Sequence, residues 1–238
     1  MEESRGPDAP RPSRRWSAAT LLRIAAVPAL VGALVGIGAF ERLIPQDPYA
    51  RAADEAGAEM LAQPGFEDRF GSLDADEAFS AGAELGIAAI PRLPDPELSE
   101  WLTITRQLLD ALDVETCAAV VRGSSDAADA LEAFKVIEIE TFTRYLEILT
   151  VGVDLVLTDA PGHPPAAQQD ADAAIVLLNE QVGSARMQEI GNAMADPMGA
   201  SDSDICSAGR DLYDGLAALD ERARGILIRM MNEPSSSI

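Results

Sequence analysis

The sequence predicts an all-α protein, with an N-terminal single transmembrane helix followed by a soluble, bundle-like domain of about six to eight helices built from helical hairpins. Three observations predict this fold class. An uncharged apolar run extends from Ile24 to Phe40, proline-marked helix starts follow it, and apolar residues then repeat at helical spacing. The β-branched stretch 150–158 could form a strand, but no second strand-like run exists to pair with it, so we expect a helix.

The apolar run is long enough to cross a bilayer. Ile24 to Phe40 carries no charge, and the preceding apolar residues extend it to about 25 residues if Arg23 reaches the lipid headgroups. A buried core helix is the alternative, but three glycines and a proline suit a lipid-embedded helix better. We therefore predict a cytoplasmic tail over 1–17, a transmembrane helix over 18–40 and an acidic extracytoplasmic helical domain over 41–238.

Arginines on the N-terminal side of the run set the expected orientation. Arg5, Arg11, Arg14 and Arg15 precede the run, whereas the charges just after it cancel, so the positive-inside rule places the N-terminus in the cytoplasm. We expect residence in a bacterial inner (cytoplasmic) membrane, with the main domain periplasmic or extracellular. A cleaved signal peptide ending near Ala39 is the open alternative, and it also places the remaining chain outside the cytoplasm.

Small residues recur along one face of the predicted span. They stand at alternating spacings of four and three and include one Gly-xxx-Gly pattern: Ala25, Ala29, Gly32, Gly36 and Ala39. Because such faces let membrane helices approach closely, we expect a membrane protein partner or self-association through this helix, besides the lipid contact of the anchor itself. The abundance of alanine and glycine throughout the chain is the alternative explanation.

The charge of the chain is strongly asymmetric. The whole chain holds 40 acidic and 18 basic residues, a formal net charge of −22. Residues 1–40 contain three of the acids and five of the bases, so 37 acids and 13 bases remain and leave the outer domain at −24. Because phosphate affinity rests on cationic side chains, this charge excludes nucleic acid as an expected partner and favours basic or cation-bridged partners.

Helix starts and stops divide the outer domain. Asp47 and Asp95 each precede a proline, as an N-cap precedes proline at the first helical position. Asp113 and Asp220 each follow a Leu-x-Ala-Leu stretch, and we interpret this echo as shared turn chemistry. The expected helical segments are one from Pro48, one from Asp74 to about Ile90, hairpins over 96–122 and 203–232, and long helices over 126–158 and 170–195, with an extended link over 91–96.

Charged side chains on these helices have ordinary structural interpretations. Glu140 and Arg144, on the long helix over 126–158, form an expected i, i+4 pair on a solvated face. Paired carboxylates at helix starts are interpreted as caps, because none continues into the ligand pattern of a calcium loop. The pairs are Asp74 with Asp76, Asp170 with Asp172, and Asp202 with Asp204.

The sequence gives little support for catalysis. The only histidine, His163, lies in a proline-rich loop without the additional ligands of a zinc site or a nucleophile beside it. No haem-attachment, Walker, nucleophile-elbow or zinc-protease motif occurs. We therefore expect no enzymatic activity, no catalytic or metal-binding residue and no cofactor.

The two cysteines are expected to form a disulfide. The predicted topology places Cys117 and Cys206 outside the cytoplasm, where thiols oxidise, and no metal-ligand spacing competes for them. Each stands beside apolar residues of its own hairpin, so both can face the interior where the two hairpins meet. Two separately buried free cysteines are the alternative.

Architecture and the lack of catalytic motifs together favour a binding function. We expect a single-pass, membrane-anchored extracytoplasmic protein that acts as an accessory, scaffold or protein-interaction subunit of a membrane complex. A helical small-ligand or lipid-binding carrier is the first alternative, with an apolar cavity lined by Met187, Met194, Met230 and Met231. A carboxylate-dependent hydrolase is the second.

Overall fold

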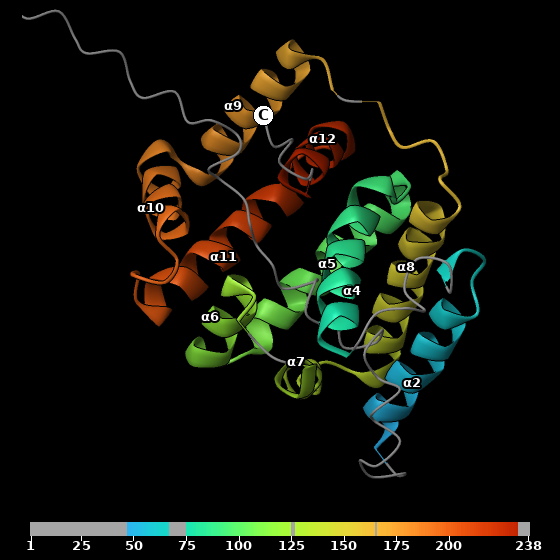
Figure 1. Ribbon diagram of the computed structural model, residues 1–238. Helices are drawn as coiled ribbons and strands as arrows, with labels where there is room; N and C mark the ends of the chain where they lie inside the picture. The colour runs from blue at the N-terminus through green and yellow to red at the C-terminus, as the bar shows by residue number, and fades with distance from the viewer. Residues whose placement is uncertain (1–46, 67–74, 125–126, 165, 233–238) are drawn as a thin grey trace, which may run out of the picture.

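The computed structural model describes residues 47–66, 75–124, 127–164 and 166–232. Within these ranges the protein is entirely helical, as predicted, with ten α-helices, one 3₁₀ turn and no strand (Figure 1). The elements are α2 (Pro48–Leu61), α4 (Ala75–Ala89), η3 (Ile90–Arg92), α5 (Asp95–Ala111), α6 (Val114–Arg122), α7 (Ala127–Phe134), α8 (Ile139–Leu157), α9 (Gln168–Val182), α10 (Ser184–Ala195), α11 (Asp202–Ala217) and α12 (Glu221–Asn232).

The predicted membrane segment lies outside the described residues. It comprises the tail over 1–17, the span over 18–40 and the small-residue face within that span. None of the helices in the described ranges combines the length and the apolar character needed to cross a bilayer.

Two groups of helices share one hydrophobic core. α2 and α4 pack on α8, whereas α5, α6 and α10 pack on α11, and α5 also contacts α8. Figure 1 shows α11 between α10 and α6, with α8 and α2 at the opposite edge of the molecule. α12 packs against α9, α5 and η3. The largest buried side chains come from both groups, among them Trp101 on α5, Tyr145 on α8 and Tyr213 on α11, so the two groups form one folding unit.

Aspartate caps begin several helices where the sequence predicts them. Asp47 accepts a hydrogen bond from the backbone N–H of Tyr49 at 2.9 Å. Asp113 and Asp220 each accept one from the N–H three residues ahead, at 3.0 and 2.9 Å, which agrees with shared turn chemistry. Gly123 ends α6 in the left-handed conformation, with φ of 66°.

The single long helix predicted over 126–158 is wrong, because the chain breaks between α7 and α8. The break turns Phe134 into the core, where its ring lies 4.8 Å from the ring of Tyr145. The Tyr49 hydroxyl donates a 2.6 Å hydrogen bond to the carbonyl of Ile137, one of the backbone groups left by the break. Aromatic packing and a distant hydroxyl therefore compensate for the interrupted helix.

The single helix predicted over 170–195 is also wrong. Gly183 separates α9 from α10 and has a φ of 90°, a backbone conformation that residues other than glycine rarely adopt. Ala185, predicted to continue the apolar stripe of α9, is instead exposed on α10. These two breaks raise the number of described helices to ten, above the predicted six to eight.

The predicted extended link and cap before α5 need correction. Residues Ile90–Arg92 form a 3₁₀ turn, in which Pro91 takes an early position that needs no N–H donor. Pro94 is the N-cap of α5, and Asp95 is its first residue and caps nothing. Asp95 pairs instead with Arg229 of α12.

Candidate functional site

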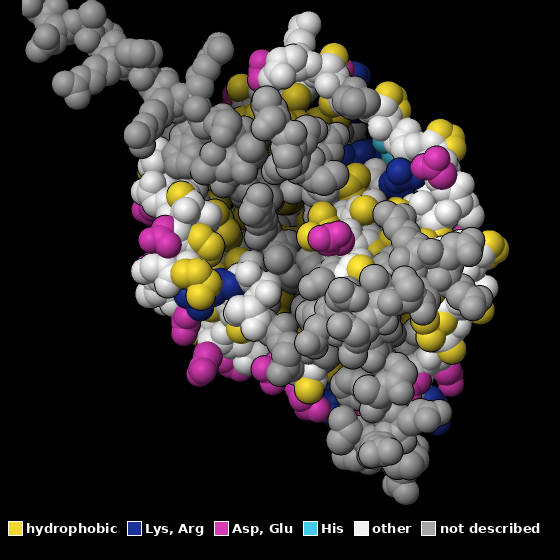
Figure 2. Space-filling model, in the orientation of Figure 1, with side chains coloured by type: hydrophobic (Ala, Val, Ile, Leu, Met, Phe, Trp, Pro, Cys, Tyr) yellow, Lys and Arg dark blue, Asp and Glu magenta, His cyan; other side chains and the backbone are white. Residues whose placement is uncertain are grey.

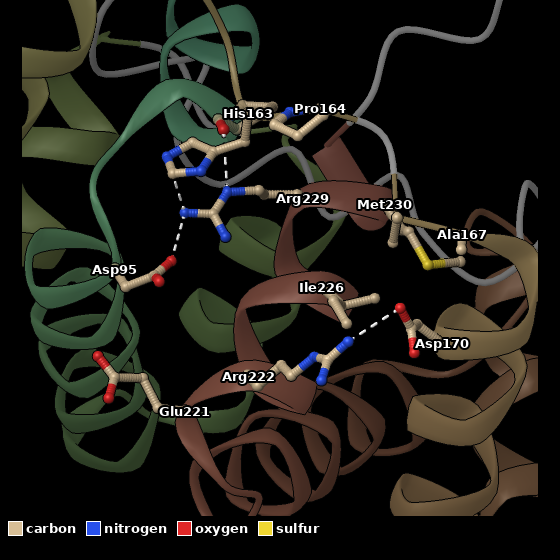
Figure 3. Close-up of a pocket in the computed structure, with 12 residues that line it drawn as sticks. Asp95, His163, Pro164, Ala167, Asp170, Glu221, Arg222, Ile226, Arg229 and Met230 are labelled. Atoms are coloured by element: carbon tan, nitrogen blue, oxygen red, sulfur yellow. Dashed lines mark hydrogen bonds and ion pairs between the residues drawn. The ribbon is translucent and has the colours of Figure 1, made fainter.

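A surface pocket of about 490 Å³ lies beside α12 and is the best candidate for a functional site. Its volume falls in the usual range for small-ligand sites, roughly 300–1,000 Å³. α12 faces the N-terminus of α9, the start of α5 and the linker that joins α8 to α9 across this pocket (Figure 3). The lining residues are Pro91, Asp95, His163, Pro164, Ala166, Ala167, Asp170, Glu221, Arg222, Ile226, Arg229 and Met230.

Arg229 is the fixed cation of the pocket. Its Nη2 donates to Asp95 Oδ1 at 2.6 Å and to the carbonyl of Leu93 at 2.9 Å, and its Nε donates to the carbonyl of Pro91 at 3.2 Å. Gly225 leaves room for this arrangement, because a Cβ there would lie 2.9 Å from Arg229 Nη1. The side chain is only 15% exposed, so it clamps α12 to the start of α5 and its charge is already balanced.

Arg222 is the exchangeable cation of the pocket. It forms an ion pair with Asp170 of α9 at 3.0 Å, and its side chain is 75% exposed. Such exposed pairs contribute little to stability, so this guanidinium can exchange its carboxylate for one on a ligand at small cost. Glu221, on the preceding position of α12, makes no ion pair with any described residue.

His163 lies at the edge of the pocket and is exposed, in the linker where the sequence places it. Its Nε2 is 3.2 Å from Nη2 of Arg229. Because a guanidinium only donates hydrogen bonds, Nε2 acts as the acceptor in this contact. The lining includes no serine, threonine or cysteine, so the histidine has no nucleophile to activate among the described lining residues.

Among the paired carboxylates whose side chains the structure describes, Asp170, Asp202 and Asp204 lie in the first turn of a helix, but none of them is the N-cap. In the first turn of α11, Asp202 pairs with Arg122, and the cap is the hydroxyl of Ser201, which accepts from the N–H of Asp204 at 3.2 Å. On α9, Asp172 accepts a hydrogen bond from Gln168. Asp74 falls outside the described residues. No cluster of three or more potential metal ligands occurs in the ranges that the structure covers.

The predicted ion pair on α8 is replaced by a contact between helices. Arg144 does not pair with Glu140; it donates two hydrogen bonds to Glu100 of α5, at 3.0 and 2.8 Å, and one to Glu147 at 2.9 Å. These hydrogen bonds, and the attraction of the guanidinium, hold the pKa of Glu100 below its usual value. The cluster therefore joins α5 to α8 and is structural in character.

The two buried phenols are part of the core. Tyr145 and Tyr213 are each 2% exposed, and Tyr213 lies against Trp101 with ring centroids 6.1 Å apart. Burial raises the pKa of both hydroxyls above the ordinary phenol value and keeps them neutral. Neither residue lines the pocket, so they belong to packing and not to the site.

The structure brings Cys117 and Cys206 to disulfide distance. The two sulfurs are 2.08 Å apart and the two Cα atoms 5.3 Å apart, and both residues are buried where α6 packs on α11. The two cysteines therefore meet, as predicted, between the helices that carry them. The pair lies in the core and not in the pocket.

The four methionines proposed for an apolar cavity are not gathered in the pocket. Met230 lines it, whereas Met187 and Met194 lie on α10 and Met231 follows on α12, all partly buried against the core. Methionines in such positions fill gaps between helices.

No feature of the sequence was interpreted as this pocket. Arg222, Ile226, Arg229 and Met230 are separated by four, three and one residues, which places them on one face of α12. That spacing was available in the sequence. The opposite wall of the pocket could not be predicted from such a spacing, because it comes from the start of α5 and from a linker without periodicity.

Comparisons of the chain with protein-family models, with curated proteins and with solved structures found no match. The fold and the pocket therefore define the class on their own. It is an all-helical domain with a buried cysteine pair at disulfide distance and a mixed-charge surface pocket.

Proposed function

We propose that this protein is a single-pass, membrane-anchored extracytoplasmic protein whose helical domain binds another protein, as an accessory or scaffold subunit of a membrane complex. The N-terminal apolar run with its preceding arginines supports the anchor in a bacterial inner membrane. The cysteine pair at disulfide distance supports a periplasmic or extracellular domain, because disulfides persist in oxidising compartments.

The observation that carries the binding proposal is how the domain uses its cations. Each of eight cationic side chains forms an ion pair with a carboxylate of the same domain: Arg92, Arg106, Arg122, Lys135, Arg144, Arg186, Arg222 and Arg229. Arg210 is also engaged, because it donates to the carbonyls of Leu109 and Leu112 at the end of α5. Arg51 on α2 and Arg224 on α12 form no ion pair with a described residue. Because most of the described cations are nevertheless paired within the domain, exposed carboxylates dominate the charge that a partner meets.

Several exposed carboxylates form no ion pair with a described residue. Glu55 and Glu59 on α2, Glu115 on α6 and Glu138 before α8 are examples. In the view of Figure 2, Asp and Glu side chains gather along the left and lower edges of the molecule. Such a surface attracts basic protein surfaces, speeds their association at low salt and repels anionic lipid headgroups.

Extraction of the full chain in mild detergent tests the proposal. We expect a stoichiometric protein partner to copurify at low salt and to dissociate as the salt concentration rises. Intact-mass measurement on the same membrane fraction tests the anchor, which requires a chain that still contains residues 18–40. Purification of the chain alone, at every salt concentration, would contradict the binding proposal.

A small-ligand-binding domain is the second candidate, and the pocket beside α12 favours it. The pocket combines an exchangeable guanidinium at Arg222 with apolar contacts at Ile226 and Met230. Native mass spectrometry of the purified full chain distinguishes the two candidates. A small molecule that copurifies and is lost in Arg222→Gln would support the carrier, and a protein partner would support the interaction subunit.

A further inference from the structure

The outer face of α9 carries apolar side chains that no other described helix covers. Val176 and Leu177 are 53% and 41% exposed, and Ala173 beside them is also exposed. Ala173 lies one turn before both of them, at the i, i+3 and i, i+4 spacings that bring side chains together on one face of a helix. We refer to this face, with the flanking Asp172 and Glu180, as the outer face of α9.

α9 is firmly held from its opposite side. Ala171, Ala174 and Leu178 are buried, and the helix packs against α12, α11 and α10. The apolar outer face is therefore presented by a fixed element and not by a flexible loop. A fixed helical face loses little conformational entropy on binding.

Acidic side chains stand at both ends of the apolar residues. Asp172 precedes Val176 by four residues and Glu180 follows it by four, so both carboxylates lie on the outer face, and both are exposed. Neither forms an ion pair with a described residue; Asp172 accepts only from the neutral side chain of Gln168. The face thus pairs a small apolar centre with two free negative charges.

We infer that the outer face of α9 is the docking site for a basic amphipathic helix of a protein partner. This inference rests on the proposed function as a protein-interaction subunit. Leucine-like residues of the partner cover Val176 and Leu177, and lysines or arginines one turn to each side meet Asp172 and Glu180. In helix-on-helix docking of this kind, apolar side chains at helical spacing provide the contact area, and charged side chains at the rim orient the partner.

Charge favours this occupant over two others. If the same face of a second copy docked here, its Asp172 and Glu180 would lie against the Asp172 and Glu180 of the first copy. These carboxylates would repel one another whether the two helices ran parallel or antiparallel. A bilayer with anionic lipids would be repelled in the same way. A basic helix turns both carboxylates into attractive contacts.

Photo-crosslinking of the full chain in its own membranes tests the inference. A photo-reactive phenylalanine analogue replaces Leu177 in one sample and Val151, an exposed valine on α8 (41%), in the matched control. We expect position 177 alone to cross-link to a peptide rich in lysine or arginine with apolar residues at helical spacing. The double variant Asp172→Lys, Glu180→Lys should lower that yield about fivefold or more, as expected for two lost charge pairs. Reversal at Glu55 and Glu59 on α2 should leave the yield unchanged.

The outcomes separate this inference from the proposed function. Equal yields from positions 177 and 151, a cross-link to a second copy or to lipid, or no response to the charge reversal on α9 would overturn the docking site. If the double variant Val176→Glu, Leu177→Glu still copurifies with the partner, the proposed docking site is wrong, but the proposed interaction function stands. If the wild-type chain copurifies with no partner, the proposed function and the docking site both fail.

Discussion

The Cα of Gly209 on α11 lies against the side chain of Val121 on α6, so closely that a Cβ at position 209 would come within 2.6 Å of Val121 Cγ2. Three residues before Gly209 is Cys206, and four before Val121 is Cys117. The absence of a side chain at position 209 therefore lets the two helices approach where the cysteines meet.

Gly209→Ala should destabilise the domain by about 1–3 kcal/mol, because the added methyl overpacks the contact with Val121. Urea unfolding of the full chain measures the change. Val121→Ala in the same chain should recover part of the loss, since it frees the volume that the methyl occupies. Gly162→Ala is the control, because a Cβ at that exposed position meets nothing within 4 Å. Equal effects of the two alanine substitutions would contradict the close-packing explanation.

Loss of the bond between Cys117 and Cys206 should destabilise the domain strongly. The cysteines are 89 residues apart, and closing a loop of that length contributes roughly 4.6 kcal/mol in the chain-entropy model. Reduction of the wild type should lower its unfolding midpoint, whereas reduction of the Cys117→Ser, Cys206→Ser variant should change nothing. Alkylation of both thiols in the unfolded, unreduced protein would show that the bond is not formed.

Arg229→Gln should destabilise the domain by about 2–3 kcal/mol, because the carbonyls of Pro91 and Leu93 and the carboxylate of Asp95 lose their donor. Arg222→Gln, on the same helix and in the same pocket, should change stability by less than about 0.5 kcal/mol, since its ion pair is exposed. Thermal unfolding of both variants checks the contrast. A similar loss in each would mean that Arg229 is not a clamp.

Coupling between Glu100 and Arg144 should disappear in acid. The pKa of Glu100 is lowered from 4.5 by hydrogen bonds from Arg144, so its contribution to folding is complete above pH 4.5 and is lost as the pH falls through the lowered value. A double-mutant cycle with Glu100→Gln and Arg144→Gln, measured by urea unfolding at pH 7 and pH 3, tests this. Equal coupling at both values would contradict the assignment.

Local chemistry explains which parts of the fold were predictable. Aspartate caps at Asp47, Asp113 and Asp220 depend on bonds within three residues, and such signals are visible in a sequence. The break after Phe134 depends on Tyr145 and on other groups distant in the sequence. It could not be predicted, because the apolar residues keep their helical spacing across it. Gly183 was visible, but a glycine inside an apolar pattern does not by itself reveal a positive φ.

Long-range pairing explains what was missed at the site. Asp95 looked like a cap because proline follows it, yet a charged partner on α12, 134 residues away, binds it instead. Arg144 likewise pairs with Glu100 of another helix and not with Glu140 of its own. The cysteine pair was predictable because elimination left each residue a single intramolecular partner.

The cysteine pair also changes the covalent topology of the chain. The linker between α8 and α9, where residues 161–164 are all exposed, lies inside the loop that the bond between α6 and α11 closes. A protease cut in this linker would divide the backbone and yet leave a single molecule. The two fragments, one with α2 to α8 and the other with α9 to α12, would separate only after reduction.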